Sequence, residues 1–191
     1  MAVANELAPI GFAVRVEDTR PERDIIEEAK TSREALAGLY RAYQPRISAY
    51  VLRRVGDKHE AEDIIGNVFV AMVQQLSRYR PSEAPFSAWL YRIATNQINY
   101  SIRKRRIRRF FGSPPDIVDP KSESSDDGEL LRIALRRLPL ALQSVLSLYY
   151  LEQLSVSDVA TVLQSPAGTV KSRLARGRRL LQTELRRLNA K

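Results

Sequence analysis

Hydrophobic residues between Thr31 and Arg109 recur at intervals of three and four positions, which is the spacing of one face of an α-helix. The first helical segment opens with Thr31 and Glu34 at the spacing of a capping box, and Pro45 is expected to kink or divide it. Its apolar positions are Leu36, Leu39, Tyr40, Tyr43, Ile47, Tyr50 and Val51.

A second helix is predicted to begin at Asp57, with Glu60 at capping distance. Its apolar stripe consists of Ile64, Ile65, Val68, Phe69, Met72, Val73 and Leu76. The opposite face carries Glu62, Asp63, Gly66 and Asn67. The pattern therefore predicts a strongly amphipathic helix with an acidic outer face.

A third helix is predicted after Ser87, which can cap it, because Leu90, Ala94, Ile98 and Ile102 recur at every fourth position. Its opposite stripe consists of Trp89, Arg92, Asn96, Asn99, Tyr100 and Arg103. Aromatic rings stack on unpaired bases, amides pair with base edges, and guanidinium groups hold phosphates. This stripe indicates contact with single-stranded nucleic acid, although packing of Trp89 into the core is equally consistent with the pattern.

The C-terminal segment ends in two helices separated by a tight turn. Ser155 is predicted to cap the first, and Ser165 the second, with Pro166 at its first position. The buried stripe of the last helix is predicted to be Val170, Leu174, Leu181, Leu185 and Leu188. Its exposed side carries Gly168, Lys171, Ser172, Arg173, Ala175, Arg176, Arg178 and Arg179. This is the pattern of a helix-turn-helix whose second helix enters the major groove.

These segments predict an all-α protein with two small helical domains joined by a flexible linker. The acidic residues 1–30 are interpreted as a mobile N-terminal extension, and residues 31–109 as the first domain. Residues 110–128 are rich in Pro, Gly, Ser and Asp and are interpreted as the linker, followed by the second domain at 129–191.

Charge and composition limit the kinds of partner and of chemical site that the chain can have. The 191 residues carry a formal net charge of +9 and a pI near 10.1, which favours a polyanionic partner such as nucleic acid. With no cysteine and one histidine, thiolate chemistry is excluded, and we expect neither a metal nor a cofactor. No secretory signal or membrane-spanning run is recognisable, so a cytoplasmic protein without membrane insertion is expected.

Three ordered motifs carry a family resemblance. They are Glu62-Asp63-Ile64-Ile65 with Val68-Phe69, Phe86-Ser87-Ala88-Trp89-Leu90-Tyr91-Arg92-Ile93-Ala94-Thr95-Asn96, and Gly168-Thr169-Val170-Lys171-Ser172-Arg173-Leu174. Over residues 31–190 the chain resembles the extracytoplasmic-function (ECF) group of bacterial sigma factors, in the sigma-70 family. The resemblance implies a non-catalytic subunit that binds core RNA polymerase, directs it to promoters and assists promoter opening.

The resemblance also implies where each partner binds. Core polymerase, through the clamp helices of its largest subunit, would contact Glu62, Asp63, Ile64, Gly66, Asn67 and Phe69. The minus-ten promoter element would contact Trp89, Arg92, Asn96, Asn99, Tyr100 and Arg103. The minus-thirty-five element would contact Gly168, Thr169, Lys171, Ser172, Arg173, Ala175, Arg176 and Arg179. An anti-sigma factor is the further partner implied. Family members commonly carry Gln-Glu where this chain has Gly66-Asn67.

Two other functions remain open from the residues alone. An autonomous helix-turn-helix regulator would share the last domain, but it would have no use for the acidic face and the aromatic face of the first. A DNA-targeted nuclease or recombinase would need Glu60, Glu62 and Asp63 to hold a metal ion. Neighbouring helical positions point about 100 degrees apart, which disfavours that arrangement.

Overall fold

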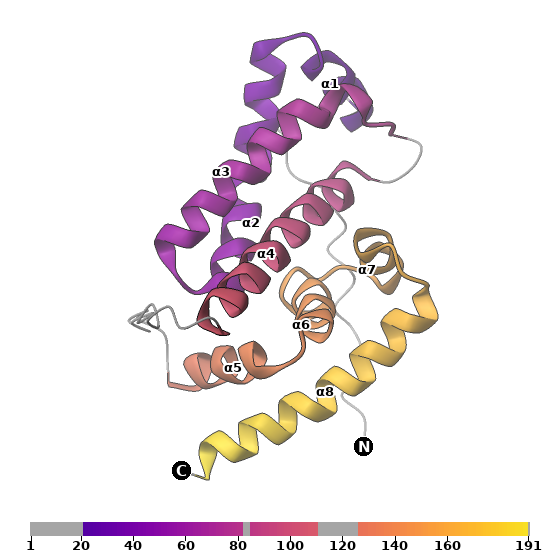
Figure 1. Ribbon diagram of the computed structural model, residues 1–191. Helices are drawn as coiled ribbons and strands as arrows, with labels where there is room; N and C mark the ends of the chain where they lie inside the picture. The colour runs from indigo at the N-terminus through magenta and orange to yellow at the C-terminus, as the bar shows by residue number, and fades with distance from the viewer. Residues whose placement is uncertain (1–20, 82–84, 111–125, 191) are drawn as a thin grey trace.

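A computed structural model describes residues 21–81, 85–110 and 126–190, and within these ranges the chain forms helices and no strand (Figure 1). The N-terminal helices are α1 (Glu22–Ala29), α2 (Arg33–Val55), α3 (Lys58–Gln75), the 3-10 turn η1 (Leu76–Arg78) and α4 (Phe86–Phe110). The C-terminal helices are α5 (Asp126–Arg137), α6 (Leu140–Leu146), the π-helical turn η2 (Ser147–Leu151), α7 (Val156–Leu163) and α8 (Ala167–Asn189). The predicted all-α class with two helical domains is confirmed.

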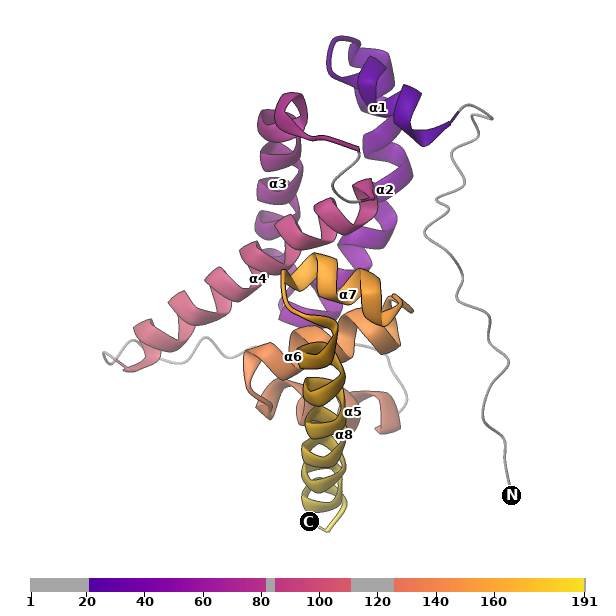
Figure 2. The same cartoon turned by 90° about the vertical axis from the view of Figure 1, so that its right-hand side faces the viewer.

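The first domain is built around the mutual packing of α2, α3 and α4 (Figure 2). The apolar stripe of each helix is buried against the other two, as Leu39, Val68 and Leu90 show with relative exposures of 0%. Helix α2 continues through Pro45, so the expected division is wrong and the kink, the other expected outcome, stays a prediction. None of the described helices is both long and apolar enough to cross a membrane.

The helix starts follow the predicted capping chemistry in part. Asp57 accepts a hydrogen bond from the backbone N–H of Glu60 at 2.7 Å, and Ser155 forms a reciprocal capping box with Asp158, so both predicted caps are confirmed. The first cap is Ser32 instead of Thr31. Ser87 lies inside α4, and its buried hydroxyl has no hydrogen-bond partner among the described residues.

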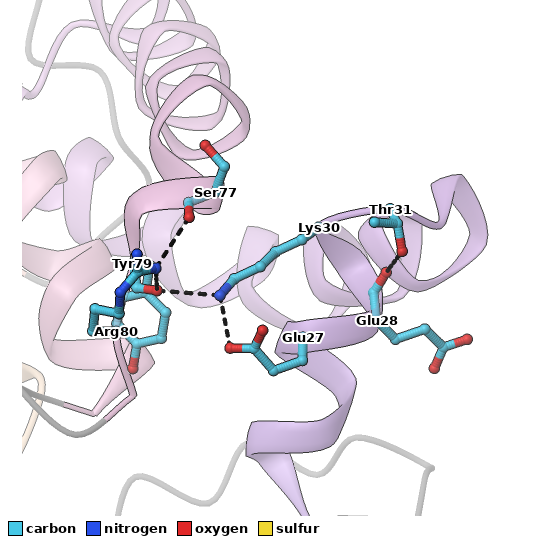
Figure 3. Close-up of polar contacts among 7 residues, drawn as sticks. All are labelled: Glu27, Glu28, Lys30, Thr31, Ser77, Tyr79 and Arg80. Atoms are coloured by element: carbon cyan, nitrogen blue, oxygen red, sulfur yellow. Dashed lines mark hydrogen bonds and ion pairs between the residues drawn. The ribbon is translucent and has the colours of Figure 1, made fainter.

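Helix α1 corrects the interpretation of residues 1–30 as a mobile extension. Ile25, Ile26 and Ala29 are buried against α2, so the prediction is wrong for this helix; residues 1–20 lie outside the described part of the chain. Figure 3 shows how the end of α1 is held: Lys30 donates to Glu27 at 2.7 Å and to the backbone carbonyl of Tyr79 at 3.3 Å. Burial and the nearby Glu22 raise the pKa of Tyr79 to about 12.

The second domain places α8 across α5, α6 and α7. Helices α6 and α8 approach most tightly at Gly177, where an added Cβ would lie 3.1 Å from the side chain of Leu146. A larger residue at position 177 would require the Leu146 side chain to shift by a few tenths of an ångström. Helix α5 begins at Asp126, within the segment predicted as linker, and residues 111–125 of that segment lie outside the described residues.

The two domains share one continuous hydrophobic core. Helix α7 packs on α4, and η2 contacts α2, so that α4 is covered by helices of both domains (Figures 1 and 2). Apolar residues of both domains, such as Leu90 and Val159, belong to the same buried cluster. The described helices are therefore packed as a single body.

Gly56 ends α2 in the left-handed conformation, with φ of 82°, and a Cβ there would overlap the Arg136 guanidinium. We predict that Gly56→Ala lowers the free energy of unfolding by about 1 to 2 kcal/mol, measured by urea denaturation. Gly38→Ala is the matched control because nothing lies within 4 Å of an added Cβ at that position. The control should be neutral or stabilising by up to about 1 kcal/mol. Equal stability of the two variants would contradict the requirement for glycine at position 56.

Candidate protein-binding and nucleic-acid-binding surfaces

The outer face of α3 is acidic and partly apolar. Glu62, Asp63, Gly66 and Asn67 are all exposed, as predicted from their spacing. The structure buries Ile64 and Phe69, at relative exposures of 4% and 6%. Their side chains pack in the core of the first domain, so the prediction that they contact a partner directly is corrected.

Two valines that the sequence analysis did not assign to this face lie on it. Val70 and Val73 have relative exposures of 54% and 50%. Val73 was predicted to be buried, but the apolar stripe of α3 is wider than the surface that α2 and α4 cover. The spacing of Asn67, Val70 and Val73 was a usable signal, because these positions follow one another around the same side of the helix. The outer face therefore combines carboxylates with exposed apolar groups.

A cleft of about 670 Å³ lies between this face and the C-terminal half of α4. Glu60 joins its two walls by accepting hydrogen bonds from Ser101 at 2.5 Å and from Arg105 at 2.6 Å. The wall formed by α3 contributes Asp63 and Asn67. The cleft therefore separates the acidic surface of α3 from the basic end of α4.

Trp89 is a core residue in this structure. Its relative exposure is 7%, and its ring centroid lies 5.1 Å from that of Tyr79 and 5.2 Å from that of Phe86. Such tilted aromatic contacts stabilise packing beyond the burial of area. The prediction that Trp89 stacks on a base is therefore corrected: the indole supports the start of α4 and is not presented at the surface.

The remaining members of the α4 stripe are unequally accessible. Asn96, Tyr100 and Arg103 are exposed on successive turns, with 64% of Tyr100 accessible, and Arg92 is half-buried. Asn99 is engaged elsewhere, because its side-chain oxygen accepts a hydrogen bond from Arg54 at 3.3 Å. The structure thus brings three of the predicted residues together on one open face.

Helix α8 presents the predicted basic surface. Its exposed residues are Gly168, Lys171, Ser172, Ala175, Arg176 and Arg179, while Thr169 and Arg173 are half-buried. Val170 and Leu174 are buried, which fixes the orientation of the helix.

The turn between α7 and α8 differs in detail from the prediction. Gln164 ends α7 in the left-handed conformation, and Pro166, not Ser165, occupies the position before α8. Ser165 instead donates to the carbonyl of Leu163 at 3.1 Å and accepts a hydrogen bond from Arg173 at 3.3 Å. This contact helps to hold the turn against α8.

An apolar groove of about 760 Å³ lies between α5, η2 and α8. Its apolar lining is formed by Leu131, Leu135, Leu146, Leu151, Leu181 and Leu185. Arg53, Arg132 and Arg178 also line it. The groove was not predictable from the sequence, because leucines at core spacing on a helix look the same whether or not another helix covers them.

Glu152 forms the main polar contact between the two domains. Its carboxylate accepts a hydrogen bond from the Tyr91 hydroxyl at 2.7 Å and also pairs with Arg53. Burial, followed by the negative charge of Glu152, raises the pKa of Tyr91. The tyrosine therefore stays protonated and remains a donor to the carboxylate at neutral pH.

Comparison with known proteins is consistent with this division into two domains. Residues 39–108 match the family model described as Sigma-70 region 2, and residues 129–181 match that described as Sigma-70, region 4. The ECF RNA polymerase sigma factor SigW of Bacillus subtilis is 29% identical over 183 residues, covering 87% of this chain and 97% of that protein. The RNA polymerase sigma-H factor of Pseudomonas aeruginosa is 32% identical over 162 residues, covering 76% of this chain and 83% of that protein.

Solved structures share the fold. The sigma factor RpoE from Bartonella quintana, solved in complex with the anti-sigma factor NepR, aligns with a TM-score of 0.66 at 22% identity, covering 79% of this chain and 96% of that chain. CnrH, solved in complex with the cytosolic domain of CnrY, also aligns with a TM-score of 0.66, at 24% identity, covering 85% of this chain and 96% of that chain.

We predict that Glu152→Ala loosens the contact between the domains, because it leaves the buried Tyr91 hydroxyl without its acceptor. The free energy of unfolding should fall by about 1 to 3 kcal/mol, measured by urea denaturation. Glu62→Ala is the control, since Glu62 is exposed and its contacts with Lys58 at 4.0 Å and with His59 at 3.8 Å both lie on the surface; its effect should stay within about 0.5 kcal/mol. Identical unfolding curves for wild type and Glu152→Ala would show that this contact contributes nothing.

Proposed function

The chain belongs to the ECF group of the sigma-70 family and directs RNA polymerase to promoters, and from this premise we propose which surface performs each part of that work. We assign polymerase binding and minus-ten recognition to residues 31–109 and minus-thirty-five recognition to residues 129–191. Each assignment rests on the exposure and chemistry of named side chains. We also propose that the chain is a non-catalytic specificity subunit and that it acts in the cytoplasm.

Core polymerase is proposed to bind the outer face of α3. The observation that carries this assignment is the combination of Glu62 and Asp63 with the exposed Val70 and Val73 on one helical face. Covering an exposed apolar group with a partner lowers the free energy of the complex. The carboxylates can pair with basic side chains of the partner and so fix how the two surfaces align. The clamp helices of the largest subunit are the proposed partner. Gly66 leaves open space in the middle of this face.

The minus-ten element is proposed to bind the exposed face of α4. An amide both donates and accepts hydrogen bonds, so Asn96 can read the edge of a base that has left the helical stack. Tyr100 can stack on an unpaired base, and Arg103 can neutralise a phosphate. Arg92 lies beside them and is half-buried. Asn99 can join this surface only after it exchanges its contact with Arg54.

The minus-thirty-five element is proposed to bind α8 in its major groove. Lys171, Arg173, Arg176 and Arg179 supply positive charge for phosphates and guanine edges. Gly168 and Ala175 are small and exposed, so the backbone of α8 can approach the duplex closely. Ser172 and Thr169 offer further polar contacts, although the Ser172 hydroxyl already donates to the Thr169 carbonyl at 2.9 Å.

An anti-sigma factor is proposed as the regulatory partner. A protein of the same fold, the sigma factor RpoE, has been solved with the anti-sigma factor NepR, and the apolar groove between α5 and α8 leaves leucine side chains partly uncovered here. A protein partner that covers the groove would remove this apolar surface from water.

The experiment that tests the function is reconstitution with core RNA polymerase, followed by sequencing of the transcripts that begin at defined promoters. The sigma-factor assignment requires transcription that depends on both the core enzyme and this chain. Sequence-specific duplex binding without any effect on core polymerase would instead indicate an autonomous regulator.

We predict that Asp63→Lys weakens binding to core polymerase at least tenfold, because it reverses a charge on the proposed docking face. Affinity is measured by fluorescence anisotropy of the labelled full chain. Asp24→Lys introduces the same charge change on the exposed surface of α1 and should leave the affinity unchanged. Full affinity of a normally folded Asp63→Lys protein would rule out the α3 face.

We predict that Asn96→Ala impairs promoter opening more than closed-complex formation. Transcription from a fully duplex promoter should fall about tenfold, the loss of one good base contact, whereas a promoter with a pre-melted minus-ten bubble should show a smaller loss. Asn189→Ala, an exposed amide at the end of α8, is the matched control and should transcribe both templates normally. An equal loss on both templates would assign Asn96 to recruitment, and unchanged transcription would remove it from the interface.

A further inference from the structure

A small basic pocket lies where the two domains meet. Its volume is about 270 Å³, and α2, α4, α5 and α6 all contribute to its lining. The lining residues are Arg54, Val55, Ile102, Arg105, Arg106, Arg136 and Gln143. Four arginines therefore line one cavity, and none of the described residues that line it is acidic.

Arg54 is the unusual member of this group. Its relative exposure is 2%, and its guanidinium nitrogens donate to the Tyr50 hydroxyl at 3.2 Å, to the Ser144 hydroxyl at 3.3 Å and to the Asn99 oxygen at 3.3 Å. All three acceptors are neutral. The Nε atom is buried and has no hydrogen-bond partner among the described residues. Within the described part of the chain, Arg54 forms no ion pair.

A buried cation without a counter-charge is costly, because the interior replaces its hydration shell only in part. Neutral hydrogen-bond acceptors and the Tyr50 ring, whose centroid lies 5.9 Å from the guanidinium carbon, offset some of that cost. A bound anion would supply the missing negative charge in a low-dielectric environment, where the attraction is strong. The structure thus contains a reason for an anion to bind at this place.

The other arginines of the pocket leave a positive excess. Arg105 pairs with Glu60 at 2.6 Å, and Arg136 pairs with Glu129 at 3.3 Å, so these two charges are compensated. Arg106 lines the pocket, is exposed, and forms no ion pair within the described residues. Arg54, which is buried, and Arg106, which is exposed, therefore carry the excess.

We propose that this pocket binds a small, multiply charged phosphate-class anion, such as inorganic phosphate, pyrophosphate or the phosphate end of a nucleotide. Guanidinium groups match the geometry of phosphate oxygens, and the cavity has the size of a small ligand. Because Arg54 and Arg106 come from the first domain and Arg136 and Gln143 from the second, the anion would hold the domains together. This inference concerns neither promoter recognition nor polymerase binding, and its test is independent of both.

The test uses the full chain, with inorganic phosphate, pyrophosphate and sodium chloride compared at matched ionic strength. Pyrophosphate at about a hundredfold excess over its Kd should raise Tm by about 5 °C or more above the chloride control, measured by differential scanning calorimetry. Isothermal titration should show saturable binding. Arg106→Gln should lower the affinity for pyrophosphate by about tenfold or more, and it should fold normally because the side chain is exposed.

Arg108→Gln is the matched control, because it removes the same charge from an exposed position of the same helix outside the pocket. It should bind pyrophosphate with wild-type affinity. An equal loss of affinity in both variants, or stabilisation no greater than that by chloride, would reduce the effect to general charge and overturn the proposal. A third arm titrates duplex DNA: if Arg106→Gln weakens DNA binding while pyrophosphate fails to bind the wild-type chain, the arginines serve the DNA backbone and the proposal is wrong.

Discussion

Helix α4 packs against helices of both domains within the one continuous core, and the rest of the structure depends on this packing. Its apolar positions pack against α2 and α3, and α7 of the second domain covers a further part of its surface. In the part of α4 that both domains cover, Asn96, Tyr100 and Arg103 stay exposed, and the C-terminal end of the helix is exposed more widely. The same packing aligns α2 so that Arg53 and Arg54 reach the second domain. The positions of the candidate surfaces follow from the packing of α4 against helices of both domains.

Some side chains that form the contact between the two domains, here called the seam, also belong to surfaces that we propose for partner binding. Asn99 belongs to the stripe that we associate with nucleic acid, yet its oxygen is bound by Arg54. Arg53, which lines the apolar groove, is held by Glu152 of the second domain. Contacts that close the seam therefore withdraw side chains from surfaces available to partners. Domain packing and partner binding are linked through shared residues.

Helix caps could be predicted from the sequence, whereas the parts of each helix that its neighbours would bury could not. The caps at Asp57 and Ser155 were predictable because each depends on residues within one turn. Trp89 was ambiguous, since only the fold brings Tyr79 beside it. Helix α1 was missed because its charged residues dominate its composition, and three apolar positions suffice to dock it. Val73 was misplaced because periodicity identifies a stripe but not the width that neighbours will cover.

The pocket at the seam and the apolar groove escaped prediction for a related reason. Both are assembled from helices distant in sequence, and each contributing residue looks ordinary in its own segment. Arg54 reads as one basic residue at the end of a helix, where positive charge is common. Only the tertiary structure shows that it is enclosed by neutral groups at the contact with another domain.

The close approach of α8 to α6 at Gly177 has an evolutionary consequence. Gly177 lies between the exposed basic residues Lys171 and Arg176 and the half-buried Leu181 and Leu185 of the same helix. Because an added Cβ at position 177 would lie 3.1 Å from the Leu146 side chain, a larger residue at either position requires local repacking between α6 and α8. The placement of α8, and with it of Lys171 and Arg176, therefore depends on core residues outside the surface that we propose for DNA. Divergence among such proteins can therefore begin in the interior, with the surface residues unchanged.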